Sequence, residues 1–221
     1  MTKQEVRDRI AEVGLIPAVR ASSTEDALFA AEAVSRGGIP IVEITITRPD
    51  IHQSISTIVQ TFPGMIVGAG GITDFETARR CLDAGAMFLA SDGFDPEIVS
   101  FIMEEGAVAI PGTLTPSEVM RAWKMGPDFV KVVPCAQVGG YSYIRALRSM
   151  FPIVPLIAAG GVNQQTASNF ILEGAIALGI GGELIPREAI SRRQSGRIAE
   201  LARRFIGFVS NARKESATTP A

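Results

Sequence analysis

The stretch Asp128-Phe129-Val130-Lys131-Val132-Val133-Pro134 places one lysine among valines and other apolar residues, a composition typical of a buried strand. The chain has only four lysines, and the other three stand in terminal or helical polar settings. A lysine that points from a sheet into a closed interior loses hydration, which disfavours its charged form and lowers its pKa. A neutral amine of this kind can attack a carbonyl and form a Schiff base. The alternative is a lysine at a strand end, with a packed stem and its ammonium in water.

Seven more strands of this kind, short and apolar without alternation, occur along the chain, which indicates a sheet buried on both faces. The eight predicted strands are at 15–20, 39–46, 65–68, 87–90, 107–110, 129–133, 153–158 and 175–179. A helix is predicted after each of them, at 24–37, 50–61, 74–84, 95–105, 116–124, 141–150, 164–173 and 189–210. Glycines beyond several of these helices, as in Glu105-Gly106-Ala107, fit left-handed caps from which the chain re-enters the sheet.

Eight strand–helix units predict an α/β fold, a single (β/α)₈ TIM barrel that occupies residues 1–221 as one domain, with an extra N-terminal helix at 3–13. The polar tail at 212–221 is predicted to fray. An open doubly wound sheet is the alternative fold. It is disfavoured because no Gly-x-Gly-x-x-Gly turn follows the first strand.

The composition excludes several classes of function. The chain has 221 residues, is 47% hydrophobic and carries a formal net charge of −2, so we expect no nucleic-acid or membrane partner. Cys81 and Cys135 lie far apart and match no zinc-ligand spacing, which favours a reducing, cytoplasmic setting. The N-terminus has no apolar signal segment. His52 is the only histidine, so no multi-histidine metal site or Ser-His-Asp triad is expected.

Chemistry in a barrel of this type takes place where the strands end and their following loops begin. Glu43 stands among β-branched residues of the second strand, and it shares a strand face with Thr45 and Thr47. An acid in this setting is costly to bury unless it is paired or used. It is either a general acid/base or part of a structural ion pair with Arg20 or Lys131. With Lys131 it would supply the minimal set for Schiff-base chemistry on a carbonyl.

Paired glycines follow the seventh and eighth strands, Gly160-Gly161 and Gly181-Gly182. Loops at these two places form the usual phosphate cup of a barrel, because glycine lets backbone N–H groups approach an anion closely. Each pair alone could equally be an ordinary tight turn. Arg20 ends the first strand and is a candidate carboxylate clamp.

With these residues in place, the chain resembles the class I pyruvate aldolases that act on 2-keto-3-deoxy-6-phosphogluconate and 2-keto-4-hydroxyglutarate, a family that includes a 6-phosphogalactonate branch. The resemblance covers roughly residues 15–186. Its motifs are Ile16-Pro17-Ala18-Val19-Arg20, Val42-Glu43-Ile44-Thr45, Val67-Gly68-Ala69-Gly70, Ile110-Pro111-Gly112-Thr113-Leu114-Thr115-Pro116-Ser117-Glu118, Phe129-Val130-Lys131-Val132-Val133-Pro134 and Gly160-Gly161-Val162.

The resemblance implies that Lys131 forms the imine and that Glu43 is the general acid/base. It implies a reversible cleavage that yields pyruvate and an aldehyde, such as glyceraldehyde 3-phosphate or glyoxylate, with no metal or other cofactor and in a homotrimer. The implied partner is a small keto acid, either phosphorylated or unphosphorylated. The candidate substrate-binding residues are Arg20, Thr47, Gly71, Pro111, Gly160, Gly161, Gly181 and Gly182.

Several positions depart from the family pattern and leave the substrate open. Thr47 stands where the gluconate branch has arginine, Gly71 and Ala159 replace threonines, and Ser91-Asp92 replaces Ser-Pro. Glu183 would repel a phosphate if it faced the glycine loops. The alternatives are a barrel that binds a phosphosugar or keto acid without turnover, and a pyruvate-imine decarboxylase or dehydratase.

Overall fold

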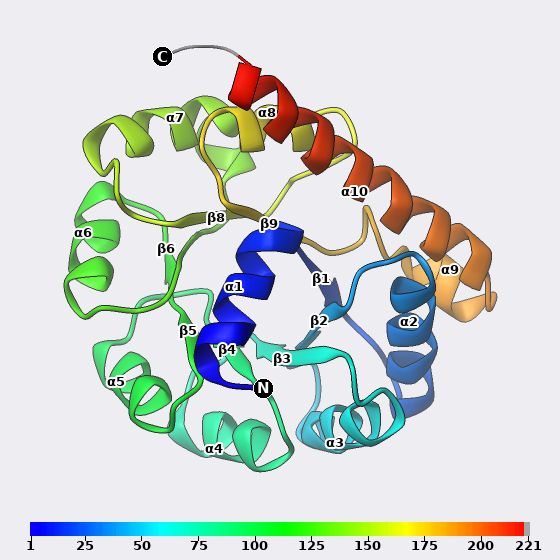
Figure 1. The fold of residues 1–221 in the computed structure, drawn as a ribbon. Coiled ribbons are helices and arrows are strands. Elements are labelled where there is room, and N and C mark those ends of the chain that lie inside the picture. Colours follow the sequence, from blue (N-terminus) through cyan, green and yellow to red (C-terminus); the bar gives the residue numbers. More distant parts are fainter. Residues whose placement is uncertain (219–221) are drawn as a thin grey trace.

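The computed structural model describes residues 1–218, which form a ring of parallel strands surrounded by helices (Figure 1). The strands are β1 (Leu15–Val19), β2 (Ile41–Thr45), β3 (Ile66–Gly70), β4 (Phe88–Ala90), β5 (Val108–Ile110), β6 (Gly112–Thr113), β7 (Val130–Val132), β8 (Leu156–Ala159) and β9 (Ala177–Ile180). The helices are α1 (Lys3–Val13), α2 (Thr24–Arg36), α3 (Ile51–Thr61), α4 (Phe75–Asp83), α5 (Pro96–Glu104), α6 (Pro116–Lys124), α7 (Tyr141–Met150), α8 (Ala167–Leu172), α9 (Arg187–Ser191) and α10 (Ser195–Thr218), with a 3₁₀ turn at Ala136–Val138.

The ring is an eight-stranded barrel, because β5 and β6 are two halves of one strand that breaks at Pro111. Proline has no N–H to donate, which interrupts the ladder at this point. The backbone of β7 spans the break: N–H groups of residues 129, 131 and 133 donate to carbonyls of Ala109, Pro111 and Thr113. The strands pair in parallel in the order β5-β4-β3-β2-β1-β9-β8-β7-β6. The predicted (β/α)₈ fold is confirmed.

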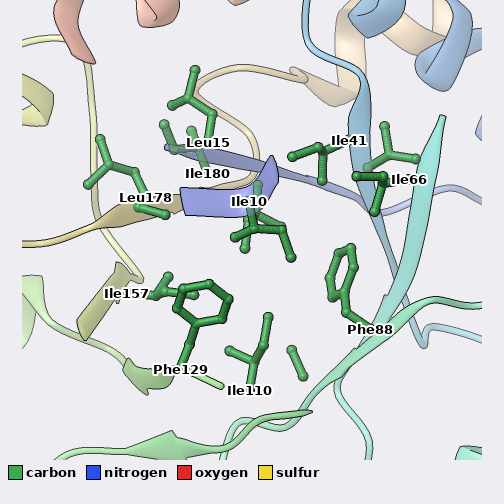
Figure 2. Close-up of a cluster of buried hydrophobic side chains, with 14 of the residues drawn as sticks. Ile10, Leu15, Ile41, Ile66, Phe88, Ile110, Phe129, Ile157, Leu178 and Ile180 are labelled. Atoms are coloured by element: carbon green, nitrogen blue, oxygen red, sulfur yellow. The ribbon is translucent and has the colours of Figure 1, made fainter. Parts of the chain in front are cut away.

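Helix α1 closes one end of the barrel. Thr2 and Glu5 form a capping box that starts the helix, and Gly14 ends it in the left-handed conformation. Figure 1 shows α1 lying across the middle of the ring, and Figure 2 shows Ile10 pointing into the barrel among side chains from its strands. Its buried neighbours include Leu15, Ile41, Phe88, Phe129 and Leu178. Chemistry is therefore confined to the opposite end, where the strands end.

The C-terminal segment differs from its prediction. The predicted helix at 189–210 is two helices, α9 and α10, and α10 continues to Thr218, into the tail that begins at residue 212. Fraying of this tail stays a prediction. Residues 219–221 lie outside the described part of the chain. The physical reason is Arg213, whose guanidinium donates to the carbonyls of Ala11, Glu12 and Ile176. A polar tail thus acquires partners that are distant in the sequence.

We expect Arg213→Met to destabilise the fold by about 2 kcal/mol, because it removes charge-assisted hydrogen bonds to the end of α1 and to the loop before β9. Urea unfolding would measure the loss. Arg203→Met is the matched control, since Arg203 is exposed on the same helix. Equal urea midpoints of unfolding for the two variants would show that Arg213 does not hold α10 in place.

Within the described residues, no helix is both long enough and apolar enough to cross a lipid bilayer.

Candidate active site

Glu43 and Lys131 face the interior of the barrel, in the layer of side chains next to the apolar cluster around Ile10. Ile41 and Phe129 belong to the cluster around Ile10 (Figure 2). Side chains alternate along a strand, so the residue two positions further along each strand faces the same interior. That residue is Glu43 on β2 and Lys131 on β7, and both line one cavity of about 220 Å³ at the end of the barrel that α1 leaves open.

The backbone of Lys131 is hydrogen-bonded on both sides, and its side chain is nearly sealed from water. Its backbone N–H donates to Pro111 O at 2.9 Å, and its carbonyl accepts from Thr113 Oγ1 at 3.0 Å. Its side chain is only 7% exposed, which rules out the alternative of a strand-end lysine with its ammonium in water. Its Nζ donates to Asp92 Oδ1 at 2.7 Å. The sequence predicts the burial, but the carboxylate beside the amine is an addition that only the structure shows.

Glu43 is half-buried, and the pKa of its carboxyl is raised above the usual range. Burial is the largest cause, and the negative charge of Asp92 adds to it, whereas the positive charges of Lys131 and Arg20 oppose it. Within the described residues Glu43 forms no ion pair, so the structural ion pair with Arg20 or Lys131 is not present. A carboxyl group with a raised pKa can carry a proton near neutral pH, as a general acid/base must.

Gly70 makes room for the Glu43 carboxyl. A Cβ added at Gly70 on β3 would lie 2.0 Å from Glu43 Oε1 and 2.3 Å from its Cδ. The carboxyl group therefore lies directly over the backbone of the neighbouring strand. Any side chain at residue 70 would push it away.

We expect Gly70→Ala to lower kcat by about 100-fold, because a displacement of roughly 1 Å in a catalytic group has an effect of this size. Stability should change little, since the group that must move is the end of a flexible side chain. Steady-state kinetics with urea unfolding would separate the two effects. Gly64→Ala is the control, because a Cβ there meets nothing within 4 Å. A Gly70→Ala enzyme with wild-type kcat would mean that the position of the Glu43 carboxyl is not critical.

The cavity also brings together most of the predicted substrate-binding residues. Its walls include Arg20, Gly160, Gly161, Gly181 and Gly182. Gly160 and Gly161 have φ values of 78° and 95°, which L-residues rarely adopt. They also lie against Pro134 and Ala136, where an added Cβ would come within 2.7 and 2.2 Å. The loop after β8 thus exposes backbone to the cavity, as the predicted anion cup requires.

Three predicted substrate-binding residues lie outside this cavity. Thr47 lines a neighbouring cavity of about 540 Å³ that shares Arg20, and its hydroxyl donates to Ala21 O. Gly71 lies beyond β3 with a φ of 77°. Pro111 is buried and offers its carbonyl to Lys131 N–H, so it positions β7. Their contact with substrate stays a prediction.

Sequence reasoning named Asp92 only as a departure from the family pattern and Glu183 only for its effect on a phosphate, and it counted neither as a site residue, although both line the cavity. The available signal was position, since Asp92 and Glu183 each closely follow a strand of the barrel. Among residues 1–218, no group of three or more His, Cys, Asp or Glu side chains is arranged to hold a metal ion.

The comparison with known proteins identifies the family. The family model for KDPG and KHG aldolase matches residues 6–201. The chain belongs to this aldolase family. The predicted family and the predicted enzyme class, an aldehyde-lyase, are thereby confirmed.

Individual relatives agree with this membership. The chain is 27% identical over 202 residues to a 2-dehydro-3-deoxy-phosphogluconate aldolase of Treponema pallidum, covering 91% of this chain and 96% of that protein. It is 30% identical over 172 residues to a probable 2-dehydro-3-deoxy-6-phosphogalactonate aldolase of Rhizobium meliloti, covering 77% and 81%. A solved KDPG aldolase of Legionella pneumophila, with pyruvate captured as a covalent carbinolamine, superposes with a TM-score of 0.84 at 30% identity, covering 90% and 96%.

Proposed function

We propose that this aldolase cleaves a 2-keto-3-deoxy-6-phospho sugar acid to pyruvate and glyceraldehyde 3-phosphate, or 4-hydroxy-2-oxoglutarate to pyruvate and glyoxylate. The observation that carries the proposal is the buried amine of Lys131 opening on the same cavity as the Glu43 carboxyl. An amine and a proton carrier in one cavity are what imine chemistry on a keto acid requires.

The reaction begins when the neutral Nζ of Lys131 attacks C2 of the keto acid and forms a carbinolamine. Glu43 donates the proton with which the C2 hydroxyl leaves as water, and the nitrogen becomes a positively charged iminium. The ionised Glu43 then accepts the proton of the C4 hydroxyl. The C3–C4 electron pair moves toward the iminium nitrogen, which releases the aldehyde and leaves an enamine. Protonation of C3 and addition of water release pyruvate and restore the amine.

The chemical group at the far end of the substrate stays open, because the residues that line the cavity have opposing preferences for an anion. Exposed backbone at Gly160 and Gly161 and the guanidinium of Arg20 favour a phosphate or a second carboxylate. Glu183 lines the same wall and disfavours both. Matching relatives include aldolases of the phosphogluconate, phosphogalactonate and KHG/KDPG type.

A substrate panel tests the proposal. Pyruvate release would be measured with phosphorylated and unphosphorylated 2-keto-3-deoxy acids of gluconate and galactonate stereochemistry, and with 4-hydroxy-2-oxoglutarate. We expect release of pyruvate and an aldehyde in equal amounts from at least one of them. Carbon dioxide, or a product that keeps the full carbon chain, would indicate a decarboxylase or a dehydratase. Binding without turnover by the whole panel would indicate a binding barrel.

We further propose that the chain acts as one barrel domain, as a homotrimer and in the cytoplasm. Large apolar side chains such as Ile153 and Met150 are exposed by 76% and 50%, which supports burial between subunits. Burial raises the pKa of the Cys81 thiol to about 12 and that of Cys135 to about 11, and neither forms a disulfide. Thiols of this kind suit a reducing compartment. Analytical ultracentrifugation would test the trimer.

A further inference from the structure

Asp92 is a second carboxylate in contact with the reactive nitrogen. It lies two residues after the end of β4, and its Oδ1 lies 2.7 Å from Lys131 Nζ. Within the described residues it is the only ion-pair partner of Lys131, since Glu43 forms no ion pair. The Lys131 side chain is 7% exposed and that of Asp92 is 64% exposed. The exposed carboxylate of Asp92 thus contacts the buried amine of Lys131 from the solvent-facing side of the cavity.

We propose that Asp92 is a catalytic residue, the counter-ion of the positive charge on Lys131 Nζ, which it stabilises both in the ammonium of the free enzyme and in the iminium formed with the substrate. This inference rests on the proposed imine chemistry and assigns a role to a carboxylate that this chemistry does not otherwise use. The nitrogen carries a positive charge twice in the cycle, first as the ammonium and then as the iminium. A carboxylate within hydrogen-bond distance favours both charged species.

The counter-ion has opposite effects on two steps. The ammonium must lose a proton to solvent before its lone pair can form the N–C2 bond, and Asp92 opposes that loss. When the neutral carbinolamine loses water, the nitrogen regains a positive charge while keeping one proton, and Asp92 favours that step. The iminium N–H can donate to the same carboxylate that now accepts from the amine. Asp92 therefore shifts imine formation to higher pH but increases the amount formed.

The other charged groups around the nitrogen do not replace Asp92. Arg20 after β1 is a cation, and Glu183 after β9 lines the cavity but forms no ion pair with Lys131 among the described residues. Glu43 on β2 is favoured in its neutral form by burial and by the charge of Asp92, which raise its pKa. Asp92 is thus the carboxylate that contacts Nζ and forms an ion pair with it.

The test measures the iminium itself. Wild type and Asp92→Asn would be incubated with saturating pyruvate and cyanoborohydride across a pH series, and the reduced adduct on Lys131 quantified by mass spectrometry. We expect the half-maximal pH of Asp92→Asn to be lower by about half a unit, and its plateau yield to be two- to fivefold lower, because a partly exposed ion pair contributes effects of this order. Asp92→Glu should return the half-maximal pH toward the wild-type value. Asp83→Asn on α4 is the control, since it removes the same charge from an exposed position.

Each outcome has a distinct meaning. A wild-type half-maximal pH and plateau in Asp92→Asn would overturn the counter-ion role while leaving the aldolase intact. A lower yield at every pH without a change in the half-maximal pH would also overturn it, because a merely structural contact behaves in this way. Absence of any adduct in the wild type would overturn the imine chemistry and the role of Asp92 together.

Discussion

Lys131→Ala is expected to abolish pyruvate release from every substrate that the wild type cleaves, with a loss on the order of 10⁴- to 10⁶-fold. Removing a nucleophile that forms a covalent intermediate has effects of this size, because no other group can take over its step. Within the described residues no other lysine lines the cavity. Coupled assay of pyruvate and mass spectrometry after borohydride reduction would measure the activity and the missing adduct.

Two controls make this result specific. Lys124→Ala removes an exposed lysine at the end of α6 and should leave both readouts unchanged. Circular dichroism of Lys131→Ala would show that the fold is intact, which is expected because alanine leaves the backbone pairing of β7 in place. Pyruvate release at the wild-type rate by Lys131→Ala, or a reduced adduct on another lysine, would remove the assignment of the nucleophile.

Local patterns predicted the fold because they reflect local physics. Three predicted helices agree with the structure at both ends: those at 3–13, 116–124 and 141–150, which are α1, α6 and α7. The first two begin with a capping box in which Thr2 or Thr115 bonds the third residue of the helix. The apolar strands needed only their composition to be recognised as buried.

The features that sequence reasoning missed depend on contacts between distant residues. Asp92 and Lys131 are 39 positions apart, and only closure of the barrel brings their side chains to 2.7 Å. Arg213 reaches carbonyls 201 and 202 positions away, which is why a polar tail became the end of α10. The break at Pro111 is likewise visible only once β7 pairs with both halves of the strand. No local pattern encodes such pairings.

Glu43→Gln should lower kcat by about 10²- to 10⁴-fold, the usual contribution of a positioned acid/base, while substrate still binds. Glutamine has the same shape and fits the space over Gly70, but its amide cannot exchange a proton with the C2 or C4 oxygen. The imine should still form with pyruvate, more slowly. Single-turnover kinetics and borohydride trapping would measure both steps. A variant with wild-type kcat would assign the proton transfers to another group.

Measurements of the free energy of unfolding distinguish the loss of catalysis in Glu43→Gln from misfolding of the variant. The pKa of Glu43 is raised in the folded protein, so between its ordinary value of 4.5 and the raised value the folded state binds more protons than the unfolded state. The stabilising contribution of Glu43 is therefore complete below the ordinary pKa and is lost as pH rises through the raised one. Glutamine has no proton to lose, so the stability of Glu43→Gln should fall less over this pH range. Urea unfolding of both proteins as pH rises from 4.5 to 8 would measure the difference, and a parallel pH dependence would mean that Glu43 is not a buried acid with a raised pKa.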